Sequence, residues 1–135
     1  MKMELTKEQL NWQTDFREFV DDVVTPYAEK NDREERLDPE LIERLKEKGY
    51  LGSMLPQEYG GMGLDWVTIG ILNEEIGRGC SSLRSLLTVH GMVALALLRW
   101  GSDEQRSQWL PKMAAGEMIG AFALTEPEVG SDGGQ

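Results

Sequence analysis

The stretch SDEQRSQWLPKMAAGEMIGAFALT, residues 102–125, contains the point at which the pattern of the chain changes. Its first residues, SDEQ, form a capping box, in which a serine and a glutamine exchange hydrogen bonds at a helix start. The helix predicted from there meets Pro111 and ends by Gly116. From Met118 the residues MIGAFALT lack helical periodicity, are mostly apolar and lead into Pro and Gly, which favours a strand. The stretch therefore predicts the end of a helical domain and the start of a strand.

The residues before this stretch predict four further helices. A second capping box, TKEQ, begins at Thr6, and apolar residues recur at helical spacing until Pro26, which bends or ends the first helix. Asp38 followed by Pro39 begins a short second helix that Gly49 stops. The apolar stripe of the first helix consists of Trp12, Phe16, Phe19, Val20, Val23, Val24 and Tyr27.

A glycine-rich loop, GYLGSMLPQEYGGMGLD, separates the second helix from the third, which Asp65 caps. The fourth helix begins at a Ser81 or Ser82 cap and is the most apolar, so we expect it to be buried around most of its circumference. The fold class predicted for residues 1–117 is therefore an all-α helical bundle. An isolated strand has no ladder partner, so the sheet of the strand after residue 117 is expected in residues that this chain does not contain.

The composition indicates a folded, acidic protein. Of the 135 residues, 40% are hydrophobic, which is enough for one ordinary core. The 24 acidic and 14 basic residues give a net charge of −10, so we expect neither a nucleic-acid nor a membrane partner. One cysteine and one histidine cannot by themselves form a disulfide or a zinc site, so no metal is expected. No apolar run approaches the length of a membrane span and no signal region begins the chain, so the expected location is cytoplasmic.

Three motifs carry a resemblance to a known family. EYGGMGLD at 58–65, GSDEQRSQWLPKMAAGE at 101–117 and FALTEPEVGSD at 122–132 occur in this order and spacing in the amino-terminal part of acyl-CoA dehydrogenases. The chain resembles this flavoprotein family along essentially its whole length. The resemblance implies that residues 1–117 are the amino-terminal helical bundle and that residues 118–135 are the first strand and turn of a truncated middle β-domain.

The resemblance also implies that the end of the chain lies beside FAD. In the family the TEP segment passes the flavin ring, so Phe122, Leu124 and Thr125 are expected to contact it. A threonine hydroxyl and backbone N–H groups can donate hydrogen bonds to the edge of the ring. Gly130 and Ser131 are expected beside the pyrophosphate, and Ser131 also beside the pantetheine end of the substrate. On the residues alone, Thr-Glu-Pro is also explained as a turn that ends a strand.

No catalytic residue is assigned within this chain. The reaction of the family begins with removal of a proton beside a thioester carbonyl, and the family's catalytic glutamate belongs to the carboxy-terminal domain, which is absent here. Glu126 precedes a proline at the predicted strand end and is expected to be a solvated or turn-fixing carboxylate. The 135-residue chain alone is therefore expected to be inactive.

Three polar residues, Arg84, Ser85 and His90, interrupt the apolar fourth helix. In the resembling proteins this helix lines the acyl end of the substrate pocket, which implies that these residues bind substrate. Arg84 is either an exposed first-turn residue or a guanidinium that recognises an acidic acyl group. His90 is either a satisfied core histidine or a functional one. Cys80 is expected to pack, and the four tryptophans are expected in the core or at an interface.

These features predict an acyl-thioester dehydrogenase, or its amino-terminal part, in which FAD accepts hydride from the β-carbon after removal of the α-proton. The carrier is expected to be CoA, as the family name implies, or acyl carrier protein. The second carrier is included because SSLRSLLTVHGMV also resembles dehydrogenases that act on short hydroxylated acyl groups carried by acyl carrier protein, in pathways that make hydroxymalonyl or methoxymalonyl units for polyketides. The family resemblance further implies an electron acceptor for the reduced flavin and a homo-oligomer. The alternative is a non-catalytic helical module that binds a protein partner through the face that missing domains would cover.

Overall fold

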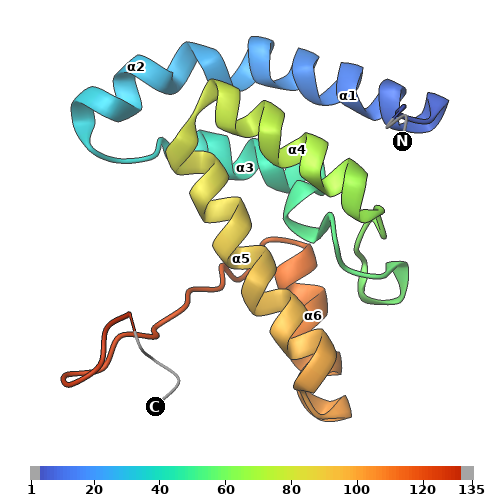
Figure 1. Cartoon of the computed structure of the whole chain (residues 1–135), viewed down its shortest axis with the longest axis vertical. Coiled ribbons are helices and arrows are strands. Elements are labelled where there is room, and N and C mark those ends of the chain that lie inside the picture. The colour runs from blue at the N-terminus through green and yellow to red at the C-terminus, as the bar shows by residue number, and fades with distance from the viewer. Residues whose placement is uncertain (1–3, 132–135) are drawn as a thin grey trace.

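The computed structural model describes residues 4–131, in which all regular secondary structure is helical (Figure 1). A long helical rod opens the chain, and α4 lies along it. α5 starts at the end of α4 and runs away from the rod, with α6 beside it. In chain order the elements are α1 (Lys7–Phe19), the π-helical turn η1 (Val20–Val24), α2 (Thr25–Glu34), α3 (Pro39–Glu47), the 3₁₀ turns η2 (Tyr50–Gly52) and η3 (Gln57–Tyr59), α4 (Trp66–Gly79), α5 (Ser81–Trp100) and α6 (Asp103–Ala114).

Helix starts follow the predicted capping pattern. Thr6 Oγ1 accepts a hydrogen bond from the Gln9 N–H at 3.2 Å, and Gln9 Oε1 accepts from the Thr6 N–H at 3.0 Å. This reciprocal pair is the predicted capping box, which satisfies two donors that a helix start would otherwise leave free. The other side-chain caps that confirm the sequence analysis are Asp38 for α3, Asp65 for α4 and Ser102 for α6.

The chain stays helical past Pro26, which the sequence analysis expected to bend or end the first helix. α1 ends at Phe19, the helix widens into η1, and α2 then carries Pro26 in its first turn. The wider π-helical turn directly before it interrupts the regular α-helical hydrogen-bond pattern, and the helix continues past the proline, which has no N–H to donate. α2 ends at Glu34, and its C-cap Glu35 has a left-handed φ of 52°.

α5 departs from the prediction in its cap and in its burial. Cys80, in an extended conformation, is the N-cap in place of Ser81 or Ser82, and no side chain caps the helix. The helix is covered on one side by α4, η2 and α6, so it is not buried around most of its circumference. Its buried residues are Leu83, Leu87, His90, Gly91 and Ala94.

By length and composition α5 could cross a membrane. The sequence-based expectation that no apolar run approaches the length of a membrane-spanning helix is therefore wrong. A single helix of this kind is weak evidence for a membrane protein, because a packed helix of a water-soluble fold passes the same test. In this structure α5 contacts α4 and α6 and carries the fully buried His90.

Two hydrophobic clusters hold the bundle together. The larger is built from α1, η1, α3, α4 and the start of α5, and it includes Phe16, Leu45 and Leu72. Tyr50 packs edge-on against Phe16, with ring centroids 5.3 Å apart, and burial raises the pKa of its hydroxyl to about 12. The smaller cluster joins α5 to α6 and consists of Leu55, Ala94, Leu110, Met113 and Ala114.

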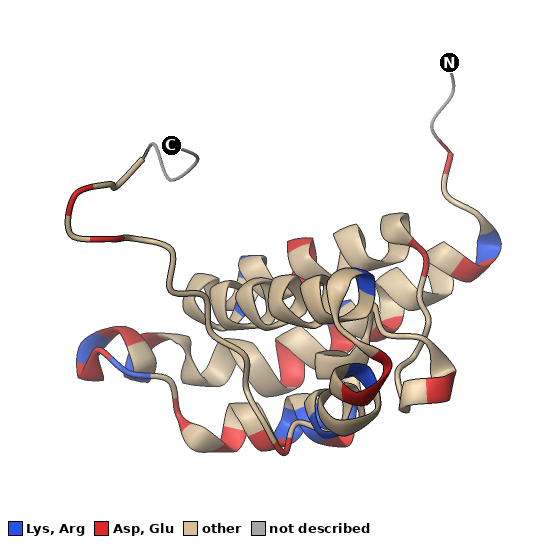
Figure 2. Ribbon diagram, turned by 90° about the horizontal axis from the view of Figure 1, so that it is seen from below, with Lys and Arg blue, Asp and Glu red and all other residues tan. Residues whose placement is uncertain are grey.

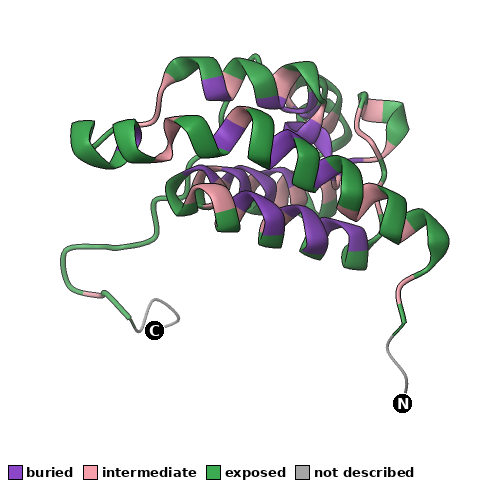
Figure 3. Ribbon diagram, turned by 90° about the horizontal axis from the view of Figure 1, so that it is seen from above, coloured by how far each residue is buried: buried purple, intermediate pink, exposed green. Residues whose placement is uncertain are grey.

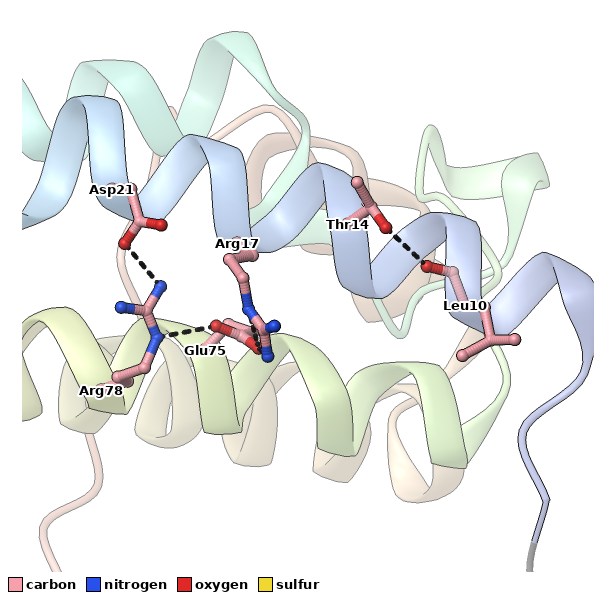
Figure 4. A network of polar contacts seen from close by, with 6 residues as sticks. All are labelled: Leu10, Thr14, Arg17, Asp21, Glu75 and Arg78. Atoms are coloured by element: carbon pink, nitrogen blue, oxygen red, sulfur yellow. Dashed lines mark hydrogen bonds and ion pairs between the residues drawn. The ribbon is translucent and has the colours of Figure 1, made fainter.

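A buried carboxylate connects α1 to α4 (Figure 4). Glu75 is 2% exposed, and its two oxygens accept hydrogen bonds from Arg17 at 2.7 Å and from Arg78 at 2.9 Å. Arg78 also donates to Asp21 at 2.7 Å. Burial alone would raise the pKa of Glu75, but the hydrogen bonds from the two guanidinium groups outweigh it and lower that pKa. The network fixes α4 against the first helical rod.

The chain after α6 leaves the bundle as a drawn-out segment without regular structure (Figures 2 and 3). The strand expected from Met118 is not formed within residues 4–131, because a strand needs a neighbouring strand to pair its backbone. One isolated bridge, between Glu126 and Val129, lies inside a tight turn. Asp132 and the residues after it, which the predicted turn includes, lie outside the described residues.

Candidate functional site

The segment at residues 121–131 carries all five residues that were expected beside the flavin, and all five are exposed. Phe122 is 52% exposed and Leu124 60%, although both are large and apolar. Within the described residues, the backbone groups of residues 121–125 form no hydrogen bond, and Thr125 forms none through its hydroxyl. The segment therefore offers apolar side chains, free N–H donors and a hydroxyl along one short stretch.

A tight turn follows Thr125. The backbone groups of Glu126 and Val129 bond to each other in both directions, at 3.0 and 3.2 Å. The side chain of Glu126 is exposed, as expected for a carboxylate at a turn. Gly130 and Ser131 follow, and a Cβ on Gly130 would meet nothing within 4 Å. The structure therefore leaves open space at Gly130, and Ser131 beside it is exposed.

A hollow of about 430 Å³ lies where this segment passes the end of α5. Phe122 forms one of its walls, and Trp100, at 77% exposure, forms another. A hollow so open and so apolar leaves hydrophobic surface in contact with water. Its remaining lining residues are Val93, Ala96, Leu97, Gly101, Gln105, Ala121 and Ala123.

A second hollow of about 430 Å³ contains Arg84 and lies between α4 and α5. Arg84 is half-buried and forms no ion pair with any residue in 4–131. Thr88 Oγ1 lies 2.8 Å from the carbonyl oxygen of Arg84 and 3.0 Å from Oδ1 of Asn73. The other walls are apolar: Met54, Trp66, Ile69, Gly91, Met92 and Leu95. An unpaired guanidinium in an apolar hollow can bind a carboxylate through paired hydrogen bonds.

His90 lies in a different environment from Arg84 and Ser85, the other two residues of α5 that were expected to bind substrate. It is fully buried, so in this structure it offers no surface to a ligand, and its Nδ1 accepts a hydrogen bond from the Gly120 N–H at 3.0 Å. Burial lowers the pKa of His90, and the nearby backbone of Met113 and Leu51 opposes that shift more weakly. Ser85 is exposed and does not line the Arg84 hollow.

The structure does not bring all the predicted residues together. Arg84 and Phe122 line separate hollows, and these hollows use different stripes of α5. Three residues of the Arg84 hollow were not identified from the sequence as site residues: Asn73, Thr88 and Trp66. Thr88 follows Arg84 by four residues and so lies on the same face of the helix, a signal that was available. Asn73 and Trp66 belong to α4, and no spacing within α5 points to them.

Comparison with known families assigns this arrangement of helices. Residues 6–117 match the family model described as acyl-CoA dehydrogenase, N-terminal domain, and all helices from α1 to α6 lie within that range. The chain belongs to the acyl-CoA dehydrogenase family. The resemblance carried by the three sequence motifs is therefore confirmed.

Comparison with individual proteins and solved structures supports the same family. The chain is 36% identical to a glutaryl-CoA dehydrogenase of Desulfococcus multivorans, over 98% of this chain and 35% of the relative. It superposes on the structure of a glutaryl-coenzyme A dehydrogenase in complex with glutaryl-CoA with a TM-score of 0.91 and 36% identity, over 98% of this chain and 35% of the other. A glutaryl-CoA dehydrogenase from Mycobacterium smegmatis in complex with FADH2 gives a TM-score of 0.88 and 35% identity, over 96% and 33%. The chain thus spans about a third of the length of these relatives.

Proposed function

We propose that the protein acts as a flavin-dependent acyl-thioester dehydrogenase and that this chain supplies its amino-terminal part. The observation that carries the proposal is the family match over residues 6–117, followed directly by an exposed segment with free donors. FAD, when bound, would accept the hydride that leaves the β-carbon of the acyl group. The α-proton would be removed by a base outside this chain, as the resemblance to the family implies for its catalytic glutamate, and Glu126 at the exposed turn is not assigned to this step.

The residues at 121–131 fit a flavin. Phe122 and Leu124 are half exposed and offer the apolar surface that an aromatic ring system can cover. The Thr125 hydroxyl and the unpaired N–H groups beside it can donate hydrogen bonds to polar atoms at a ring edge, where they would stabilise negative charge. Gly130 and Ser131 provide a small, open turn that a pyrophosphate could approach closely.

The Arg84 hollow is proposed to hold the acyl group, with Arg84 binding a carboxylate at its far end. This is supported by the absence of an ion pair at Arg84 within the described residues and by the apolar walls around it. It agrees with similarity to proteins named glutaryl-CoA dehydrogenase, whose acyl group is acidic. Ser85, which is exposed on the same helix, and Ser131 are proposed as further substrate contacts.

The carrier of the acyl group is proposed to be CoA, because the relatives reported above carry that name. An acyl carrier protein, with a role in making polyketide extender units, remains the second proposal for the carrier. A separate protein that accepts electrons, assembly into a homo-oligomer and a cytoplasmic location belong to the proposal as well.

The proposal is tested by an assay of the protein as its native host makes it and of the 135-residue chain alone. Each would be supplied with FAD, an artificial electron acceptor and glutaryl-CoA, butyryl-CoA or their carrier-protein thioesters. We expect turnover only for the native protein, and faster turnover with the glutaryl thioester. Lack of turnover by the native protein with every thioester would favour a helical binding module instead.

The contribution of Arg84 is measured with Arg84→Met in the native protein, which removes the charge and keeps an apolar stem of similar reach. Loss of a carboxylate contact predicts that KM for glutaryl-CoA rises roughly tenfold or more while KM for butyryl-CoA changes little. Equal effects on both substrates would contradict recognition of the carboxylate.

A further inference from the structure

The segment that carries the proposed flavin contacts is tied to the bundle at one residue, Gly120. Its N–H donates to Nδ1 of His90 at 3.0 Å. Within the described part of the chain, no other hydrogen bond joins residues 119–131 to the helices. This bond is therefore the last polar attachment before Phe122, Leu124 and Thr125.

Gly120 also packs against α5 and α6 more closely than another residue could. A Cβ at this position would lie 2.9 Å from Cβ of Val93 and 3.0 Å from Cε of Met113. The Val93 atom belongs to the rigid part of a helix and cannot move aside cheaply. The hydrogen bond and the close approach thus fix the same residue from two directions.

His90 is suited to accept this bond because it is held neutral. An imidazole nitrogen accepts a hydrogen bond only when it carries no proton, so the proton of the neutral ring must lie on Nε2. The ring is fully buried, and burial disfavours its charged form, which lowers its pKa. Nε2 is equally buried and forms no hydrogen bond of standard geometry to a described residue. The bond to Gly120 is therefore the one well-formed polar contact of a buried ring.

We propose that His90 is a positioning residue, which fixes Gly120 through Nδ1 and thereby sets where residues 121–125 leave the helical bundle. The proposal rests on the proposed function, in which those residues contact the flavin, and His90 itself touches neither flavin nor substrate. A histidine that merely fills space in the core would be replaceable by any apolar side chain of similar volume. The acceptor on Nδ1 distinguishes the two roles.

The first measurement is made on the unaltered 135-residue chain. His90 is its single histidine, so the imidazole nitrogen resonances in an NMR spectrum need no assignment by mutation. We expect Nδ1 to be unprotonated and Nε2 to carry the proton at pH 7, with a coupling between Nδ1 and the Gly120 amide. A proton on Nδ1 would overturn the proposal without reference to any flavin.

The second measurement compares His90→Leu with His90→Asn in the same chain. Leucine fills the space without an acceptor, whereas the amide oxygen of asparagine lies at the same number of bonds from the backbone as Nδ1. We expect the Gly120 amide of His90→Leu to exchange its hydrogen roughly five- to tenfold faster and residues 121–125 to become more mobile. His90→Asn should restore both, and equal behaviour of the two variants would overturn the proposal.

The third measurement uses the native protein purified with its flavin. His90→Leu should weaken FAD retention by about the same factor as it speeds hydrogen exchange of the Gly120 amide. His90→Asn should retain FAD. Gly120→Ala should weaken FAD retention although His90 is intact. Unchanged retention in His90→Leu would refute the positioning role. A native protein without flavin would refute the proposed function, while the first two measurements would still decide whether His90 fixes Gly120.

Discussion

At the scale of single residues, Thr125 is the sharpest test of the proposed flavin contact. Its hydroxyl is exposed and unpaired within residues 4–131, so Thr125→Ala removes a donor without disturbing the bundle. In the native protein we expect reduction of the flavin by substrate to slow roughly three- to tenfold, the value of one hydrogen bond. Stopped-flow absorbance measures the rate, and Glu128→Gln in the adjacent turn is the control. Unchanged kinetics in Thr125→Ala would remove the residue from the site.

The buried carboxylate of Glu75 leads to a prediction about the stability of the fold. Glu75→Gln keeps the shape of the side chain but leaves Arg17 and Arg78 without their shared carboxylate. Both guanidinium groups are about half exposed and can be hydrated, so we expect a loss of about 1–3 kcal/mol at pH 7. Urea unfolding measures the difference, and Glu74→Gln, on the exposed side of α4, should change the free energy of unfolding by less than about 0.5 kcal/mol. Equal losses for the two variants would contradict the network.

The lowered pKa of Glu75 adds a dependence on pH. A carboxyl group whose pKa is lower in the folded state than its ordinary value of 4.5 stabilises the fold fully above that value. The stabilisation is lost as the pH falls through the folded-state pKa. The difference in unfolding free energy between the unaltered chain and Glu75→Gln should therefore stay constant from pH 7 to about 5.5 and narrow below pH 4.5. A difference that persists unchanged at pH 3 would show that the charge is not its source.

At the scale of elements, the loop between α3 and α4 depends on Gly61. A Cβ there would lie 2.0 Å from the carbonyl oxygen of Leu55, which also accepts a hydrogen bond from the Gly63 N–H. Because that oxygen belongs to the backbone, Gly61→Ala must displace the loop, at a cost of about 1–3 kcal/mol or more. Gly70→Ala is the matched control, since it meets nothing within 4 Å on the exposed face of α4 and should stabilise by about 0.5–1 kcal/mol. Thermal unfolding of both variants with the same sign would contradict this account.

Sequence patterns predicted the helix caps but not the contacts between distant elements. Caps at Thr6, Asp65 and Ser102 were predictable because their partners lie within three residues along the chain. The contact of Glu75 with Arg17 joins residues 58 positions apart, and that of His90 with Gly120 joins residues 30 apart, so no local pattern contains them. The burial of α5 was overestimated for the same reason: hydropathy indicates that a face can be buried but not that a neighbour covers it.

At the scale of the whole molecule, apolar surface is concentrated at the far end of α5 and on the segment after α6. Trp100 is 77% exposed, and Phe122 and Leu124 are more than half exposed. Water-soluble monomers rarely leave such residues together in water, and those that do usually cover them in a complex. The sequence placed Phe122 and Leu124 in a site through family motifs. For Trp100 the sequence analysis expected a place in the core or at an interface, and the structure excludes the core.

This concentration predicts how the chain behaves in isolation. The 135-residue chain should bind the dye anilinonaphthalene sulfonate, and Trp100→Ser combined with Phe122→Ser should lower the dye fluorescence at least twofold, because both residues line one hollow. Leu10→Ser is the matched control, since Leu10 is 49% exposed on α1 and lines none of the hollows described above. The native protein should bind less dye per molecule if further residues cover this surface. Equal fluorescence from all four proteins would show that the surface beside Phe122 and Trp100 does not bind the dye, which would contradict this account of the exposed apolar surface.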